Sequence, residues 1–266
     1  MMKWFEVALV VLTFATGITW LLDRLFFAKR RAARGGLIEE KEPLVVDYAR
    51  AFFPVLAVVL VLRSFVAEPF RIPSSSMMPT LLIGDFILVN KFSYGIRLPI
   101  NNRKVIELGE PQRGDVVVFR PPQHPDQDWI KRVIGLPGDV VAYRDNTVYV
   151  NGEPFAYGAP RQYVGTGRGR EMTGADELAE TMPGRTHQIL EVDRRGLPDP
   201  GDGEWRVPEG QYFVMGDNRD RSDDSRFWGT LPESQLRGRA FLIWLNCEGW
   251  FCTGNFDVSR IGNGIR

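Results

Sequence analysis

The residues best suited to chemistry are three consecutive serines, Ser74–Ser76, which follow an apolar segment that ends at Ala67. A serine hydroxyl is a weak nucleophile until a neighbouring base takes its proton. The chain has only two histidines: His124 lies in a proline-flanked run, and His187 lies in a region rich in glycine and charge. Neither stands at a predicted strand end beside an orienting acid. A Ser-His-Asp site is therefore the less favoured alternative, and a lysine is the preferred base.

Lys131 is the best candidate for that base, because it lies in an apolar predicted strand, residues 129–134. Alternate side chains of a strand share a face, so Lys131 lies with Trp129 and Val133 while Arg132 points the other way. Burial among apolar neighbours lowers the pKa of a lysine from about 10.4 toward neutrality, a shift of roughly three units that costs the charged form about 4 kcal/mol. The alternative is an ordinary solvated pair of cations.

A third segment, residues 215–229, is dense in aspartate, asparagine and serine. It does not fit the spacing of a calcium loop, because positions three, six and twelve, counted from its first aspartate, are Arg219, Ser222 and Trp228. A structural turn with an ion pair between Asp224 and Arg226 fits better. Ser222 is placed to hydrogen-bond a neutral lysine amine and aim it.

Two apolar segments precede these motifs. Residues 4–22 are close to bilayer-spanning length, and the basic flank after them favours a retained anchor over a cleaved signal peptide. Residues 51–67 are interrupted by Arg63, whose side chain is able to snorkel, so a second span is preferred over a buried soluble helix. The linker, residues 23–50, is basic and is predicted to be cytoplasmic, which places residues 68–266 on the exported side.

The exported part is predicted to be mainly β, because short β-branched and aromatic runs alternate there with Gly, Pro and Asp. Residues 140–144 and 147–150 form a candidate hairpin around an Asp-Asn turn. Residues 151–208 are poor in apolar runs and are interpreted as an insertion of long loops or an extended hairpin that forms a smaller lobe. The predicted fold is thus two transmembrane helices followed by an antiparallel β-rich catalytic domain. Other candidate strands are residues 85–89, 115–119, 129–134, 211–215 and 240–245.

Composition excludes several classes of function. The chain has 33 basic and 33 acidic residues, so it lacks the positive field that a nucleic-acid partner needs. Its two cysteines, Cys247 and Cys252, are far from either histidine in sequence, so no zinc site and no other metal or cofactor is expected. The cysteines are either two unrelated small hydrophobes or a short-loop disulfide in an oxidising compartment.

Three segments together resemble the bacterial signal peptidase I family, membrane-anchored serine proteases that remove signal peptides from exported proteins. They are SSSMMPTLLIGDFILVNKFSYG at residues 74–95, IKRVIGLPGD at residues 130–139 and GDNRDRSDDSRFWG at residues 216–229. The resemblance also covers both anchors and a tail that includes Trp244 and residues 259–262. It implies an endopeptidase that cuts after an A-x-A-like site and forms an acyl-enzyme intermediate.

The resemblance also implies a role for each motif residue. Ser76 is the nucleophile and Lys131 the general base, while the Ser74 hydroxyl and the Ser76 backbone N–H form the oxyanion hole. Ser222 orients the lysine, and Asp224 with Arg226 is a supporting ion pair. The family usually has glycine where this chain has Ser75, so a side chain must be accommodated there.

Substrate and location follow from the same resemblance. Small apolar pockets accept alanine-sized side chains one and three residues before the cut, and the partners are signal peptides of exported preproteins and the lipid bilayer. An apolar β-surface with Trp244, and also Trp250 and Phe251, rests on the lipid, unless Trp244 is a core residue. The expected location is the bacterial cytoplasmic (inner) membrane, with the catalytic domain on the periplasmic side. The pocket positions are Ile72, Pro73, Met77, Leu81, Ile87 and Ile130.

Two other functions remain open from the sequence. Another Ser/Lys protease, such as the self-cleaving repressor type, shares the dyad but has a DNA-binding helix-turn-helix and no anchors. A non-enzymatic, membrane-anchored β-module that binds exported proteins has the anchors but no reactive serine. Labelling by a serine-directed acylating inhibitor distinguishes this module from an enzyme.

Overall fold

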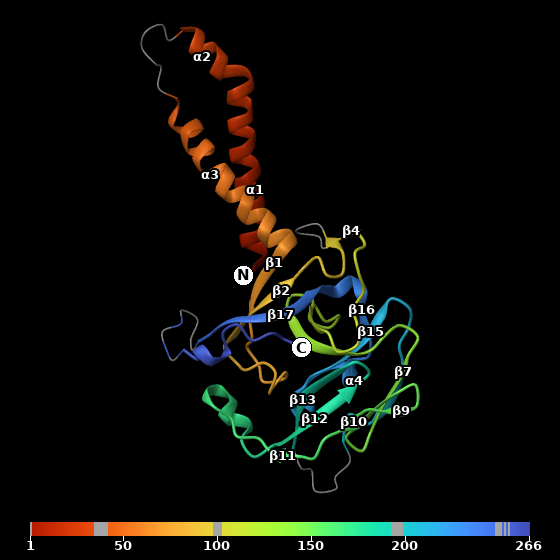
Figure 1. Cartoon of the computed structure of the whole chain (residues 1–266). Coiled ribbons are helices and arrows are strands. Elements are labelled where there is room, and N and C mark those ends of the chain that lie inside the picture. Colours follow the sequence, from red (N-terminus) through yellow and green to blue (C-terminus); the bar gives the residue numbers. More distant parts are fainter. Residues whose placement is uncertain are drawn as a thin grey trace. The chain divides into compact units, whose positions relative to one another are not determined.

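A computed structural model describes residues 2–34, 42–97, 103–192, 199–247, 252, 254 and 256–266. The chain divides into two compact units (Figure 1). One unit contains residues 1–67 with residues 97–103, and the other contains residues 68–96 with residues 104–266.

The first unit is a pair of apolar helices. Its elements are α1 (Met2–Leu22), the π-helical turn η1 (Asp23–Phe27), α2 (Ala28–Arg34), α3 (Leu44–Val61) and the π-helical turn η2 (Leu62–Val66). Helices α1 and α3 pack together, with the rings of Trp20 and Phe53 at 5.7 Å. Residues 7–31 and 44–64 are each long and apolar enough to cross a membrane.

The helix ends differ from the predicted segment ends. Helical structure continues from α1 through η1 and α2 to Arg34, and α3 begins at Leu44 instead of residue 51. The charged side chains of Asp47 and Arg50 obscured this earlier start, although Pro43 before Leu44 is a good position to begin a helix. The predicted first segment and α1 both end at residue 22, whereas the ranges 23–50 and 51–67 do not coincide with the helices. The membrane boundaries themselves stay a prediction.

The second unit is β-rich, as the sequence predicts. Its main sheet has the order β1-β2-β17-β5-β6-β15-β16 and is antiparallel from β2 to β16. The predicted strand 240–245 is longer in the structure, where its first residues pair with β5 and its remaining residues pair with β2. The strands are β1 (Ala67–Arg71), β2 (Asp85–Asn90), β5 (Val116–Phe119), β6 (Trp129–Gly135), β15 (Gln211–Met215), β16 (Leu231–Pro232) and β17 (Leu236–Asn246).

The predicted hairpin is confirmed, with β7 (Val140–Arg144) paired to β8 (Thr147–Val150). Both turn residues, Asp145 and Asn146, have positive φ angles of 48° and 62°, as this tight turn requires. A four-stranded sheet of order β14-β7-β8-β9 is completed by β9 (Glu153–Pro154) and β14 (Gly203–Arg206). Part of the region that the sequence assigns to an insertion therefore pairs directly with this hairpin.

The rest of residues 151–208 contains an extended hairpin, β12 (Asp176–Met182) with β13 (Arg185–Glu191). Strands β10 (Ala156–Tyr157) and β11 (Arg161–Gln162) pair with β12, and the 3-10 turn η3 (Gly167–Met172) follows them. Of the two predicted alternatives for this region, the extended hairpin is the one observed. The remaining short elements are β3 (Ile96–Arg97), β4 (Lys104–Ile106), η4 (Arg219–Arg221), α4 (Ser225–Trp228), η5 (Glu233–Gln235) and η6 (Val258–Arg260).

Candidate active site

The Lys131 amine donates a hydrogen bond of 2.8 Å from Nζ to Ser76 Oγ. Strand β6 positions Lys131 opposite Val117 of β5, and its amine lies 5.7 Å from the centre of the Trp129 ring. The two residues are almost excluded from solvent, with exposed fractions of 4% for Lys131 and 7% for Ser76. Residues 55 positions apart in the chain thus form one buried pair.

Burial is the main cause that lowers the pKa of Lys131, from 10.5 to about 8. The carboxylates of Asp224, Asp223 and Asp217 favour the charged amine and limit this shift, while the Arg226 guanidinium adds to it. A neutral amine is a base and a charged ammonium is not. The site therefore holds a lysine able to accept a proton close to neutral pH.

Asn218 holds the segment that contains Ser76. Its backbone N–H donates to the Ser76 carbonyl at 3.1 Å, and its side-chain amide donates to the Ser75 carbonyl at the same distance. Ser74 Oγ lies 3.4 Å from Ser76 Oγ, on the same short turn. Ser75 is half-buried, so this turn accommodates its side chain. Sequence analysis missed Asn218, although its place in the GDNRD motif was an available signal.

A close approach at Gly216 brings the third motif against the serine. A Cβ on Gly216 would lie 2.5 Å from the Ser76 carbonyl oxygen and 2.2 Å from Ser222 Oγ. Ser222 is buried, and its hydroxyl contributes to the lowered pKa of the Asp224 carboxyl but makes no hydrogen bond to the Lys131 amine. The expected hydrogen bond from Ser222 to Lys131 is thus not formed in the structure, and the orienting role stays a prediction.

Asp224 and Arg226 form a buried ion pair, with Nε 2.9 Å from Oδ1 and Nη2 3.0 Å from Oδ2. Asp224 also accepts a hydrogen bond of 3.0 Å from the Gly216 backbone N–H and caps α4 through the Arg226 N–H. Burial opposes ionisation of Asp224, but the Arg226 charge and these hydrogen bonds hold its pKa below the ordinary value. The pair therefore fixes the turn that carries Gly216.

A second charged cluster lies beside the dyad. Arg132 donates from Nε and Nη2 to the two carboxylate oxygens of Asp217 at 2.8 and 2.7 Å, and the Thr80 hydroxyl donates to Asp217 at 2.5 Å. His187 Nε2 lies 3.6 Å from Asp217 and 3.2 Å from Glu180, and burial lowers the pKa of the histidine. The hairpin β12–β13 thus delivers two buried titratable groups to this cluster.

Neither histidine serves as a base for Ser76 in the described part of the chain. His124 is exposed and stacks on Trp129 at 5.6 Å, whereas His187 lies against Asp217 and Glu180. No local pattern signals that His187 is buried, because polar and glycine-rich segments flank the strand that carries it.

Comparison with known proteins identifies the family. The model of the family described as signal peptidase, peptidase S26 matches residues 45–245. The chain belongs to this family. It is 47% identical to the signal peptidase I of Pseudomonas fluorescens, over 97% of this chain and 98% of that protein. It is 44% identical to the signal peptidase I of Pseudomonas aeruginosa, over 97% and 98%. A solved signal peptidase I from Enterococcus faecalis is 29% identical over 50% of this chain and 98% of that one, with a TM-score of 0.30.

Membership of the signal peptidase family supports signal peptidase function and makes the chain a peptidase, a hydrolase of peptide bonds. The two apolar N-terminal helices agree with a protein anchored in a membrane. Among the described residues, no group of three or more His, Cys, Asp or Glu side chains is arranged to hold a metal ion.

The residues predicted to line the signal peptidase pockets lie mostly in the core. They pack in one cluster that also includes Val116, Val118 and Ile265, and they are nearly or fully excluded from solvent. Their contribution to a pocket stays a prediction, because they expose almost no surface that a substrate could contact. Pro73 differs, because it is exposed and lies outside the cluster. The five clustered residues are Ile72, Met77, Leu81, Ile87 and Ile130.

Trp244 is 40% exposed and packs edge-on against Phe86 at 5.7 Å, so it is not a fully buried core residue. Contact of this surface with lipid stays a prediction. Trp250 and Phe251, which the sequence assigns to the same surface, lie outside the described residues.

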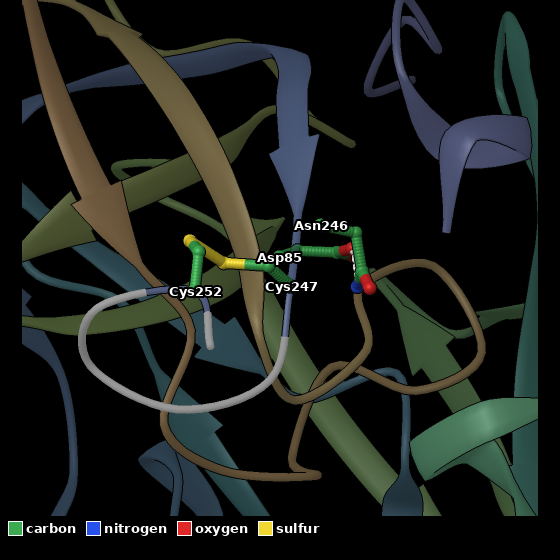
Figure 2. Close-up of a disulfide and its surroundings, with 4 residues drawn as sticks. All are labelled: Asp85, Asn246, Cys247 and Cys252. Carbon is green, nitrogen blue, oxygen red and sulfur yellow. Dashed lines mark hydrogen bonds between the residues drawn. A yellow bond between two sulfur atoms is a disulfide. The ribbon is translucent and has the colours of Figure 1, made fainter. Parts of the chain in front are cut away.

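Cys247 and Cys252 are joined in a disulfide at the end of β17 (Figure 2). Of the two alternatives left by the sequence, the structure has the short-loop disulfide. Beside it, Asn246 Nδ2 donates to Asp85 Oδ1 at 2.7 Å, and the Cys247 N–H donates to the Gly84 carbonyl at 3.2 Å. The disulfide-bonded turn is therefore linked to the start of β2.

Proposed function

We propose that this chain is a membrane-anchored endopeptidase that removes signal peptides from exported preproteins, with Ser76 as the nucleophile and Lys131 as the general base. The observation that carries the proposal is the 2.8 Å hydrogen bond between these two buried side chains, together with the pKa of about 8 for the lysine. Curated relatives named signal peptidase I match nearly the whole chain, which supports the substrate class.

The reaction begins with Lys131 in its neutral form. Its amine takes the Ser76 proton while Ser76 Oγ attacks the carbonyl carbon of the scissile peptide bond. The oxygen of the tetrahedral intermediate then carries a negative charge, which the Ser76 N–H and the Ser74 hydroxyl stabilise by hydrogen bonds. The short Ser74–Ser76 distance supports this role, because both donors belong to the same turn.

Collapse of the intermediate breaks the C–N bond, and the Lys131 ammonium gives its proton to the leaving amine. The new N-terminus of the exported protein departs, and the signal peptide stays as an ester on Ser76. A water molecule then attacks the ester while Lys131 takes one of its protons. Return of this proton to Ser76 Oγ releases the signal peptide and restores the neutral lysine.

The substrate class follows from the family, whose members named signal peptidase I match nearly the whole chain. Signal peptides end in an A-x-A-like site, so we expect small side chains to be read one and three residues before the scissile bond. The location that we propose is the bacterial inner membrane, with the catalytic unit on the periplasmic side, because the basic segment between the two apolar helices favours the cytoplasm. There the enzyme meets preproteins whose signal peptides lie in the bilayer.

The deciding experiment uses the full chain in detergent with a serine-directed acylating inhibitor and a purified preprotein. We expect one labelled site, found at Ser76 by peptide mapping, and cleavage of the preprotein after its A-x-A site. Both should vanish in Ser76→Ala. Absence of labelling in folded wild-type protein would favour a non-enzymatic β-module, whereas labelling of Ser76 with no preprotein cleavage would favour another Ser/Lys protease.

A further inference from the structure

The turn that carries Ser76 is held from both ends. We call residues 74–82 the nucleophile loop. At its start, Asn218 binds the carbonyls of Ser75 and Ser76, as described above. At its end, Asp85 is fully buried and accepts a hydrogen bond of 2.8 Å from the Leu82 N–H. A second set of contacts therefore holds the far end of the loop.

Arg260 supplies most of these contacts. Its Nε donates to Asp85 Oδ1 at 2.8 Å, and its Nη2 donates to Asp85 Oδ2 at 2.5 Å. The same Nη2 donates to the Thr80 carbonyl at 2.9 Å. One guanidinium thus joins the nucleophile loop, at Thr80, to Asp85 at the start of β2. A bidentate contact of this kind fixes orientation as well as distance.

The segment that carries Arg260 is itself anchored to the sheet. The Gly262 N–H donates to the Ile243 carbonyl at 2.8 Å, and the Ile243 N–H donates to the Asn263 carbonyl at 2.9 Å. Ile265, a few residues later, is buried in the same cluster as Met77 of the nucleophile loop. Arg260 therefore reaches the loop from a fixed platform.

Movement at Thr80 is transmitted to Ser76, because the intervening residues form compact turns. The Leu81 N–H donates to the Met77 carbonyl at 2.9 Å, and the Met78 N–H donates to the Ser75 carbonyl at 3.1 Å. Met77, Met78 and Leu81 are fully buried. The loop thus has little freedom to absorb a displacement of one end before it reaches Ser76.

We propose that Arg260 is a positioning residue for the nucleophile: through the Thr80 carbonyl and Asp85 it holds the loop so that Ser76 Oγ stays aligned with Lys131 and with the scissile carbonyl. This inference rests on the proposed function. We expect Arg260 to affect the chemical step and not substrate affinity. Its guanidinium contacts the Thr80 carbonyl and Asp85, which hold the nucleophile loop.

The test compares Arg260→Gln with Arg113→Gln in the full chain. Arg113 is a matched control, because its guanidinium also binds one backbone carbonyl, that of Ile134, and one carboxylate, that of Asp139, at similar burial. Neither of these contacts involves a residue of the nucleophile loop. An acylating inhibitor, allowed to react to completion, gives the number of active sites in each preparation. Each cleavage rate is divided by this number, so that unfolded protein does not affect the comparison.

We expect kcat per titrated site to fall by about 10- to 100-fold in Arg260→Gln with KM nearly unchanged, the size of effect that a displacement of about 1 Å produces. Arg113→Gln should keep the wild-type kcat per site. The pH at which activity reaches half its plateau should not move in Arg260→Gln, because Arg260 is not among the charges that shift the Lys131 pKa. A wild-type kcat per site in Arg260→Gln would overturn the inference.

Arg260→Lys covers the case in which the glutamine variant does not fold. Lysine keeps the charge but lacks the planar fork, so it is unable to bind Asp85 and Thr80 in the same geometry. We expect a kcat per titrated site between those of wild type and Arg260→Gln, and an unchanged value would reject a need for the bidentate contact. Failure of the proposed function is separate, since it would appear as wild-type protein with no titratable serine.

Discussion

Lys131 and Arg132 are consecutive in β6, yet their side chains end in two different networks. Lys131 Nζ donates to Ser76, whereas Arg132 binds both carboxylate oxygens of Asp217. Successive side chains of a strand point to opposite faces, which separates the two cations despite their adjacency. The Asp217 carboxylate also neutralises the guanidinium. The lysine therefore becomes a base through burial, while the arginine serves to hold Asp217.

Removal of either dyad member should abolish cleavage. Loss of the lysine base in Lys131→Ala is expected to lower kcat by about 100- to 10,000-fold, and loss of the nucleophile in Ser76→Ala by at least as much. The measurement is cleavage of a purified preprotein by the full chain in detergent, with circular dichroism to show that the fold is retained. Near-normal turnover by either folded variant would rule out the dyad.

Activity should rise with pH through the pKa of Lys131. The reaction needs the neutral amine, so below a pKa of about 8 the competent fraction falls about tenfold per pH unit and levels off above it. The pH profile of kcat/KM with a peptide substrate measures this limb. A limb at the ordinary lysine value of 10.5 would mean that burial does not tune the base.

Gly216→Ala should damage both activity and stability. The added Cβ meets Ser222 Oγ and the Ser76 carbonyl within 2.5 Å, and the carbonyl belongs to backbone that Asn218 already holds. Overpacking of this kind costs about 1–3 kcal/mol. Thermal unfolding and preprotein cleavage measure the two effects. The control is Gly158→Ala, whose Cβ meets Ala179 at an ordinary 3.4 Å, and equal behaviour of the two variants would contradict the prediction.

Arg219→Ala should be strongly destabilising. Arg219 Nη2 lies 2.5 Å from Glu180 Oε2, and both side chains are almost completely buried. Burial alone would raise the pKa of Glu180, but the charge of Arg219 and the His187 ring hold it well below the ordinary value. Removal of the guanidinium leaves a buried carboxylate without its main partner, at a cost of about 3–5 kcal/mol.

A double variant tests whether Arg219→Ala is unstable because Glu180 loses its partner charge or because packing around Arg219 is lost. In Arg219→Met combined with Glu180→Gln, neither charge remains, so the protein should be more stable than Arg219→Ala alone. Chemical denaturation of the full chain in detergent compares the two. If the double variant is the less stable one, packing around Arg219 and not the unpaired carboxylate determines the loss.

The disulfide should contribute measurably to stability. Its cysteines are five residues apart, and closure of so short a loop in the unfolded chain is worth about 2 kcal/mol. Cys247→Ser with Cys252→Ser should lower the unfolding midpoint accordingly. Dithiothreitol should shift the wild-type midpoint by the same amount and leave the double variant unchanged; a reductant-insensitive wild type would argue against the bond.

Features that depend on local pattern are predictable from the amino-acid sequence. Two long apolar runs predict the helices of the first unit, and the Asp145-Asn146 turn predicts the β7–β8 hairpin, because neighbouring residues set the periodicity and the turn. Because successive side chains of a strand point to opposite sides, the sequence also predicts that Lys131 and Arg132 lie on opposite faces of β6. Helix α3 begins at Leu44, before the predicted span at residue 51, because charged side chains such as Asp47 and Arg50 interrupt an apolar run without interrupting a helix.

Contacts between side chains far apart in the sequence are set by the three-dimensional fold. Arg132 and Asp217 are 85 residues apart, and Arg260 and Asp85 are 175 apart. No local periodicity specifies such pairs, because they form only when strands far apart in the chain become neighbours in a sheet and exclude water from the charged groups between them. Burial is equally a property of the assembled fold. Burial lowers the pKa of Lys131 to about 8, and it places His187 of β13 in a buried cluster with Glu180 and Asp217.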